Sequence, residues 1–155
     1  MREIRTEVEI DASREAVWEV LADFAHYGEW NPFLEIAGEA RVRTKVRLTT
    51  HPPGRRSNTQ VAEVLTAWAP RHLRIQGVLG WPWLFSGTHI LELSESPGRE
   101  GGTTLVNREE FGGVLAPVVL WLLGSRLPSG FEAMNQALKA RVERVASMRA
   151  PEAVA

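Results

Sequence analysis

The chain has 155 residues, a net charge of −1, and hydrophobic and charged fractions of 44% and 24%, which are typical of one globular domain with its own core. A net charge near zero argues against nucleic-acid binding. The lack of cysteine excludes disulfides, thiolate metal sites and cysteine nucleophiles. The charged N-terminus lacks the apolar stretch of a signal peptide. The longest apolar run, Val114–Leu123, has ten residues, whereas a transmembrane helix needs ~20. We therefore expect a cytoplasmic protein without a transmembrane segment.

The first third of the chain predicts a strand followed by a helix. Apolar and charged residues alternate from Glu3 to Ile10, which is typical of a half-buried strand. Ser13 is suited to cap a helix that ends near Phe24, and we expect Trp18 of this helix in the core. Residues 26–32 form a turn or a second small helix that stops at Pro32.

Six strand-like segments come next, separated by short turns rich in proline and glycine. Connections this short favour antiparallel neighbours, because parallel strands need a long crossover. We place the strands near Phe33–Gly38, Thr44–His51, Asn58–Trp68, His72–Val78, Leu84–Glu95 and Thr103–Gly112.

The last element is a long helix. Ser129 and Glu132 fit a capping box at its start, and one apolar stripe runs through Phe131, Met134, Leu138, Val142 and Val145. Only this helix is large enough to cover the inner face of so many strands. The sequence therefore predicts an α+β fold, in which a curved seven-stranded antiparallel sheet surrounds the C-terminal helix. Residues 1–150 would form a single domain and residues 151–155 a flexible tail.

This order of elements, together with short motifs at its key points, resembles the START-type superfamily called SRPBCC, and most closely its bacterial polyketide cyclase/dehydrase-like members. The resemblance covers nearly the whole chain, and it departs from the general pattern at Trp81-Pro82-Trp83. The motifs are Val17-Trp18, Trp30-Asn31-Pro32-Phe33, Gly87-Thr88-His89, Glu109-Glu110-Phe111-Gly112-Gly113 and the segment from Gly130 to Lys139.

The resemblance implies the helix-grip fold and a hollow between the sheet and the last helix. Three functions occur on this scaffold, because fold alone does not define activity. The first is binding of a mostly apolar or aromatic small molecule, such as a lipid, a polyketide or an isoprenoid-like compound. The second is an enzyme of the polyketide cyclase or aromatase type. The third is a partner-binding domain similar to the Hsp90-ATPase activators.

Three polar residues fall on the face of the sheet that we expect to point inward. A hairpin turn centred near Arg99 would place His89 opposite Glu109 and Leu91 opposite Asn107, with opposed Cβ atoms ~5 Å apart. A buried carboxylate requires a partner, so His89 and Glu109 could satisfy each other structurally, bind a ligand, or act as catalytic acid and base. These alternatives stay open at the level of the sequence.

Aromatic and apolar side chains would form the wall and rim of the hollow, which we expect to enclose on the order of several hundred Å³. The candidates for binding the ligand, besides His89, Asn107 and Glu109, are Trp30, Phe33, Trp81, Trp83, Phe85, Phe111, Trp121, Phe131 and Met134. The apolar run Val114–Leu123 would form a lid over the hollow or the surface of a possible homodimer. Because metal-ligand spacings and glycine-rich phosphate loops are absent, we expect no metal and no cofactor.

Overall fold

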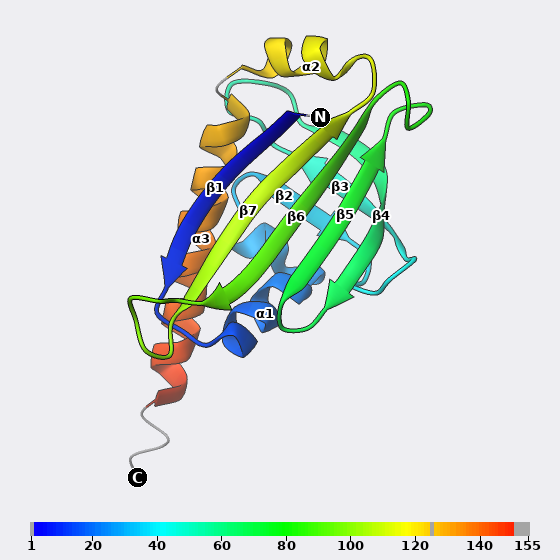
Figure 1. Ribbon diagram of the computed structural model, residues 1–155. Helices are drawn as coiled ribbons and strands as arrows, with labels where there is room; N and C mark the ends of the chain where they lie inside the picture. Colours follow the sequence, from blue (N-terminus) through cyan, green and yellow to red (C-terminus); the bar gives the residue numbers. More distant parts are fainter. Residues whose placement is uncertain (1, 125, 151–155) are drawn as a thin grey trace.

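The computed structural model describes residues 2–124 and 126–150. Within them, seven antiparallel strands form one sheet in the order β1-β7-β6-β5-β4-β3-β2, which curves around the C-terminal helix (Figure 1). The elements are β1 Arg2–Ile10, α1 Arg14–Ala22, the 3₁₀ helix η1 Phe24–Glu29, β2 Leu34–Ala37, β3 Lys45–Thr50, β4 Asn58–Trp68, β5 His72–Val78, β6 Ser86–Glu95, β7 Thr103–Gly112, α2 Ala116–Leu123 and α3 Arg126–Arg149. This confirms the predicted helix-grip fold. The predicted tail, residues 151–155, lies outside the described residues.

Local sequence explains where the first elements begin and end. Ser13 has an extended backbone and its Oγ accepts a hydrogen bond from the backbone N–H of Ala16, so it caps α1 as predicted. The residue before a proline avoids helical geometry, and η1 correspondingly ends at Glu29, ahead of Pro32. The six later strands also lie within two residues of their predicted bounds.

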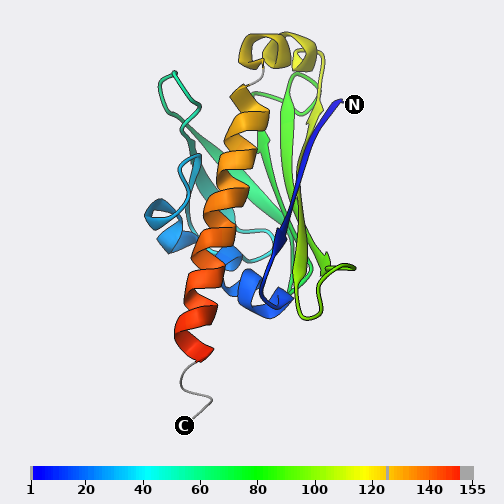
Figure 2. The same cartoon turned by 90° about the vertical axis from the view of Figure 1, so that its left-hand side faces the viewer.

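The core lies between the inner face of the sheet and α3, which runs along that face (Figure 2). Phe131, Met134, Leu138 and Val142 of the predicted stripe are buried, and each buried side chain of this size contributes ~1.5–3 kcal/mol. Val145, at the end of the stripe, is only partly buried. Trp18 packs partly buried against the same core, as expected.

Gly130 allows α3 to approach the start of β2 closely. A Cβ atom placed on Gly130 would lie 2.4 Å from Cδ2 of Phe33, so no larger residue fits without movement. The Phe33 ring then meets Phe131 edge to face, with centroids 5.4 Å apart. This contact explains why a glycine is present in the interior of α3, although glycine in a helix costs ~1 kcal/mol relative to alanine.

The start of the last helix differs from the prediction. We expected Ser129 as the N-cap, but α3 already begins at Arg126 and Ser129 lies in its first turn, where its Oγ donates to the carbonyl of Arg126. Pro128 is compatible with this position because the first-turn N–H groups have no partner within a helix. The capping-box pattern of Ser129 and Glu132 had indicated the later start.

Candidate functional site

The inner faces of β6 and β7 carry the three polar residues singled out in the sequence. β6 and β7 pair with His89 opposite Glu109 and Leu91 opposite Asn107, which confirms the predicted register. His89 and Asn107 are buried, and Glu109 is half-buried. The register therefore brings two hydrogen-bonding residues and one carboxyl group to the same side of the sheet, facing α3.

His89 does not bond to Glu109 among the described contacts, so that part of the expectation is wrong. Its Nε2 lies 2.7 Å from Oδ1 of Asn107, the diagonal neighbour on β7, and long side chains reach diagonal neighbours readily. The imidazole also stacks on Phe131 of α3, with ring centroids 5.3 Å apart and planes 20° apart. The stacking and the bond to Asn107 together orient the ring.

The polar chain of this site continues from Asn107 through α3 to β1. Asn107 Nδ2 donates to Oδ1 of Asn135 at 2.8 Å, and Asn135 Nδ2 donates to Oγ1 of Thr6 at 3.0 Å. Thr6 Oγ1 in turn donates to the backbone carbonyl of Asn107 at 3.2 Å. We call His89, Asn107, Asn135 and Thr6 the polar chain; it joins four elements across the core.

The direction of these bonds defines the state of His89. Because Asn107 uses its Nδ2 on Asn135, its Oδ1 faces His89 and must accept, so the imidazole carries its proton on Nε2. Burial lowers the pKa of His89, and the bond to Asn107 only partly offsets this. His89 is therefore neutral near pH 7, and its Nδ1 is a hydrogen-bond acceptor.

Glu109 has a different environment from the polar chain. Its carboxyl group forms no hydrogen bond or ion pair with any other residue in the described ranges, and burial raises its pKa to about 7. At neutral pH the group is thus divided between the acid, which donates a hydrogen bond, and the carboxylate, which only accepts. A half-buried carboxyl group without a protein partner is costly, which makes Glu109 the strongest candidate for contact with a bound molecule.

Two glycines stand opposite each other on β5 and β6, and Gly87 of this pair adjoins the Glu109 carboxyl group. Gly77 of β5 stands opposite Gly87 of β6, so neighbouring strands lack side chains at the same level of the sheet. A Cβ atom on Gly87 would lie 2.7 Å from Oε1 of Glu109. Gly87 therefore makes room for the Glu109 carboxyl group.

The aromatic candidates separate into an inner and an outer set. Phe33, Phe111, Phe131 and Met134 are buried among the core residues. Phe85 is half-buried and lies 6.2 Å from Phe111 between ring centroids. By contrast, Trp81, Trp83 and Trp121 are exposed at the end of the sheet that α2 covers (Figure 1).

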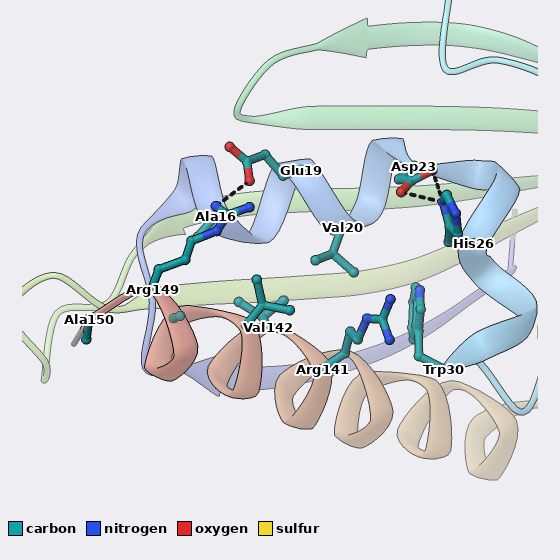
Figure 3. A pocket seen from close by; sticks show the side chains of 12 residues that line it. Ala16, Glu19, Val20, Asp23, His26, Trp30, Arg141, Val142, Arg149 and Ala150 are labelled. Carbon is teal, nitrogen blue, oxygen red and sulfur yellow. Dashed lines mark hydrogen bonds and ion pairs between the residues drawn. The ribbon is translucent and has the colours of Figure 1, made fainter. Parts of the chain in front are cut away.

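Trp30 lies away from the other candidates. It contacts Tyr27 of η1 at a centroid distance of 4.8 Å and lines a surface hollow of about 530 Å³ between α1 and α3, together with Val20, His26 and Arg141 (Figure 3). In this hollow Asp23 raises the pKa of His26 through a hydrogen bond. A second hollow of about 430 Å³ borders η1 and β2. Neither contains the inner aromatic residues or Glu109, so the interior cavity between sheet and α3 stays a prediction.

Sequence reasoning missed Asn135, Thr6 and Gly77. Asn135 lies next to Met134 on the apolar face of the last helix. A polar amide at such a position could have indicated a hydrogen-bonding partner on the sheet. Thr6 and Gly77 carry no comparable signal, because threonine is common in strands and an isolated glycine only suggests a close approach.

Comparison with known proteins identifies the class. The model of the family described as "Polyketide cyclase / dehydrase and lipid transport" matches residues 1–143. The chain therefore belongs to this family. No curated protein sequence matches the chain.

Several solved structures share the fold. The Zhui aromatase/cyclase from a Streptomyces species has a TM-score of 0.71 and 20% identity, covering 92% of this chain and 94% of its own. A START superfamily protein from Mycobacterium smegmatis has a TM-score of 0.67 and 22% identity, covering 92% and 98%. Norcoclaurine synthase from Thalictrum flavum, solved with dopamine and hydroxybenzaldehyde, has a TM-score of 0.67 and 18% identity, covering 92% and 87%.

Among the described residues, no helix is long and apolar enough to cross a membrane. Nor does any group of three or more histidine, aspartate or glutamate side chains within residues 2–124 and 126–150 suit a metal ion.

Proposed function

We propose that this protein binds a mostly apolar or aromatic small molecule between the sheet and α3. The observation that carries the proposal is the carboxyl group of Glu109, which points to the inner side of the sheet and has no partner among residues 2–124 and 126–150. A polar group that is partly removed from water is stabilised by a hydrogen-bonding partner. A hydroxyl, carbonyl or amine of a bound molecule would supply it.

The surroundings of Glu109 support an apolar body for that molecule. Phe85 and Phe111 pack against each other with ring centroids 6.2 Å apart, and Phe111 also borders Gly87, whose missing side chain makes room for the Glu109 carboxyl group. Small-molecule sites are generally apolar with a few polar groups that orient the ligand. A lipid, a polyketide or an isoprenoid-like compound with one polar group fits this description, and the family description names both polyketide chemistry and lipid transport.

The test compares two adjacent glutamates of β7. Fatty acids and the dye 1-anilinonaphthalene-8-sulfonate would be titrated against the wild type, Glu109→Gln and Glu110→Gln, with tryptophan fluorescence and dye emission as readouts. We expect saturable binding, weakened about tenfold or more by Glu109→Gln because a hydrogen bond to a charged group is worth ~1.5–3 kcal/mol. Glu110 pairs with Arg108 on the opposite face of β7, at 2.7 Å, and its variant should bind normally.

The result against the proposal would be an absence of saturable binding in the wild type. Equal weakening in both variants would also contradict it, because only Glu109 faces inward. The folded state of each variant would be checked by its cooperative urea transition.

A second candidate function is catalysis of the cyclase or aromatase type, favoured by the pKa of Glu109. A group with a pKa of about 7 is suited to transfer protons at neutral pH. His89, neutral and oriented by Asn107, lies directly opposite it in the sheet. The two residues would serve as acid and base toward a folded poly-β-keto substrate.

Turnover separates the two candidates. If the site is catalytic, Glu109→Gln should retain affinity for a polyketide-like substrate analogue while product formation falls by ~10²–10⁴-fold, the usual contribution of general acid–base catalysis. A wild-type protein that binds the analogue and releases it unchanged would support binding alone.

A further inference from the structure

One end of the molecule exposes an unusual concentration of large apolar side chains. Trp81 and Trp83 are each 64% exposed and Trp121 is 79% exposed. Leu79, Val118 and Leu122 are exposed beside them. We call these six residues the apolar end; they come from the β5–β6 loop and from α2, above the sheet in Figure 1.

Backbone hydrogen bonds hold the segments of the apolar end together. The N–H groups of Val114 and Leu115, just before α2, donate to the carbonyls of Trp83 and Leu84 at 3.0 Å each. Trp81 and Trp83 stack with centroids 6.2 Å apart and planes 16° apart. Arg55, from the β3–β4 loop, donates from Nη2 to the carbonyl of Leu122 at 3.0 Å. The apolar end is therefore one continuous surface.

α2 is apolar on both of its sides. Ala116, Leu120 and Leu123 pack toward the core, whereas Val118, Trp121 and Leu122 face outward. A helix on the surface of a globular protein normally carries polar residues on its outer side. Large exposed apolar patches of this kind mark interaction sites.

The charges around the apolar end have a single sign. The segments 51–57, 79–85 and 113–126 contain three arginines, Arg55, Arg56 and Arg126, and no aspartate or glutamate, in a chain whose net charge is −1. None of the three arginines forms an ion pair with a residue in the described part of the chain. Some nearby carboxylates are neutralised by ion pairs: Glu3 and Glu110 pair with Arg108, and Glu35 pairs with His51.

We propose that the apolar end binds the surface of an anionic lipid bilayer. Tryptophan rings favour the interface between headgroups and acyl chains, apolar helix side chains insert at that boundary, and unpaired arginines are attracted to anionic headgroups. A second copy of the chain fits less well, because a twofold interface would bring this arginine-rich surface against itself. The inference goes beyond small-molecule binding and does not depend on it.

The test is co-sedimentation with vesicles. Wild-type protein should bind vesicles of equimolar phosphatidylglycerol and phosphatidylcholine, with a blue shift of tryptophan emission, and should bind pure phosphatidylcholine much more weakly. Replacing Arg55 and Arg56 by glutamine should lower the partition coefficient about fivefold per arginine. Trp121→Ala should lower it about tenfold by removing apolar area.

Trp68, which is 66% exposed, provides the control, because it lies at the end of β4 that is remote from the β3–β4 loop. Trp68→Ala should leave vesicle binding unchanged, and Glu109→Gln should do so too, which separates this inference from the proposed small-molecule site. All variants would first be compared with the wild type in thermal unfolding without lipid.

Several outcomes would overturn the proposal. One is the absence of binding to the anionic vesicles, and another is equal loss of binding in Trp68→Ala and Trp121→Ala. A third is a wild-type protein that does not bind the vesicles and forms a stable dimer in light scattering, which Trp121→Glu converts to a monomer. The apolar end would then bind a second copy of the chain.

Discussion

Asn107 joins three elements through a single side-chain amide. It accepts from His89 of β6 and donates to Asn135 of α3, while Thr6 of β1 completes the polar chain. Removing one member of such a network leaves its buried partners unsatisfied, and each unsatisfied group costs ~1–3 kcal/mol. The polar chain should therefore contribute to the fixed position of α3 against the sheet.

The corresponding prediction concerns Asn107→Ala. We expect it to lower the free energy of unfolding by about 2–4 kcal/mol, because it strands His89 Nε2 and Asn135 Oδ1 in the core. Urea denaturation would measure the change. Thr104 on the same strand is the control: its buried Oγ1 has no hydrogen-bond partner in the part of the chain that the structure describes, so Thr104→Val should be neutral or stabilising. Similar losses in both variants would show that the polar chain adds nothing specific.

A second prediction follows from Glu109. Its pKa of about 7 in the folded protein exceeds the ordinary value of 4.5, so between these two pH values the folded state holds a proton that the unfolded state has released. The contribution of Glu109 to the free energy of unfolding thus has its full value below pH 4.5 and is lost as the pH rises through about 7. The glutamine side chain in Glu109→Gln does not ionise, so the variant should not lose this stability as the pH rises.

Urea unfolding at a series of pH values from 5 to 8 would measure the effect. Relative to the wild type, Glu109→Gln should gain stability with rising pH, by on the order of 1–3 kcal/mol at pH 8, reduced by the solvent that reaches this half-buried group. His89, whose pKa is lowered, acts in the opposite direction in both proteins and cancels in the difference. Parallel stability curves for the two proteins would contradict the raised pKa.

The sequence predicted the inward faces of β6 and β7 and their register, because alternation and the position of the hairpin turn determine both. It did not predict that His89 would bond to Asn107 in place of Glu109. That choice depends on Phe131 and Asn135, which reach the site from α3. Contacts between elements distant in the chain have no local signature.

α3 depends on one small residue, Gly130, for its close contact with Phe33, which lies just before β2. Replacing Gly130 by alanine should favour the helix by ~1 kcal/mol, but the new Cβ atom would fall 2.4 Å from the Phe33 ring. Overpacking of this kind typically costs ~1–3 kcal/mol, so we expect Gly130→Ala to destabilise the protein. The midpoint of urea unfolding would show it.

Ala140, exposed on the same helix, supplies the control for helix propensity. Ala140→Gly should cost only ~1 kcal/mol, with no effect on the fluorescence of the tryptophans. A stabilised Gly130→Ala variant would mean that Phe33 moves aside without cost, and that the contact does not determine how closely α3 approaches β2.

The helices show where sequence patterns were sufficient and where they failed. The apolar stripe of α3 and the cap of α1 were visible as local patterns. α2 was not expected as a helix, because Val114–Leu123 lacks both a polar side and a capping residue and contains Pro117. Pro117 lies in the first turn of α2, where proline is tolerated, and contacts with the β5–β6 loop hold the start of the segment.

The whole molecule is a curved sheet whose inner face is covered by one long helix. The order of elements was readable from the sequence because short turns favour antiparallel neighbours and only one helix could cover the sheet. The interior cavity was inferred from resemblance to a family, since the space left between side chains depends on packing that periodicity does not describe.

Native mass spectrometry of the protein, purified gently from its own host, tests the central claim most directly. We predict a species heavier than the bare chain by one apolar molecule, which dissociates on activation and is depleted in Glu109→Gln but retained in Glu110→Gln. A bare chain from the host, together with no complex after incubation with fatty acids or aromatic compounds, would contradict the claim that this fold holds a small molecule between its sheet and α3.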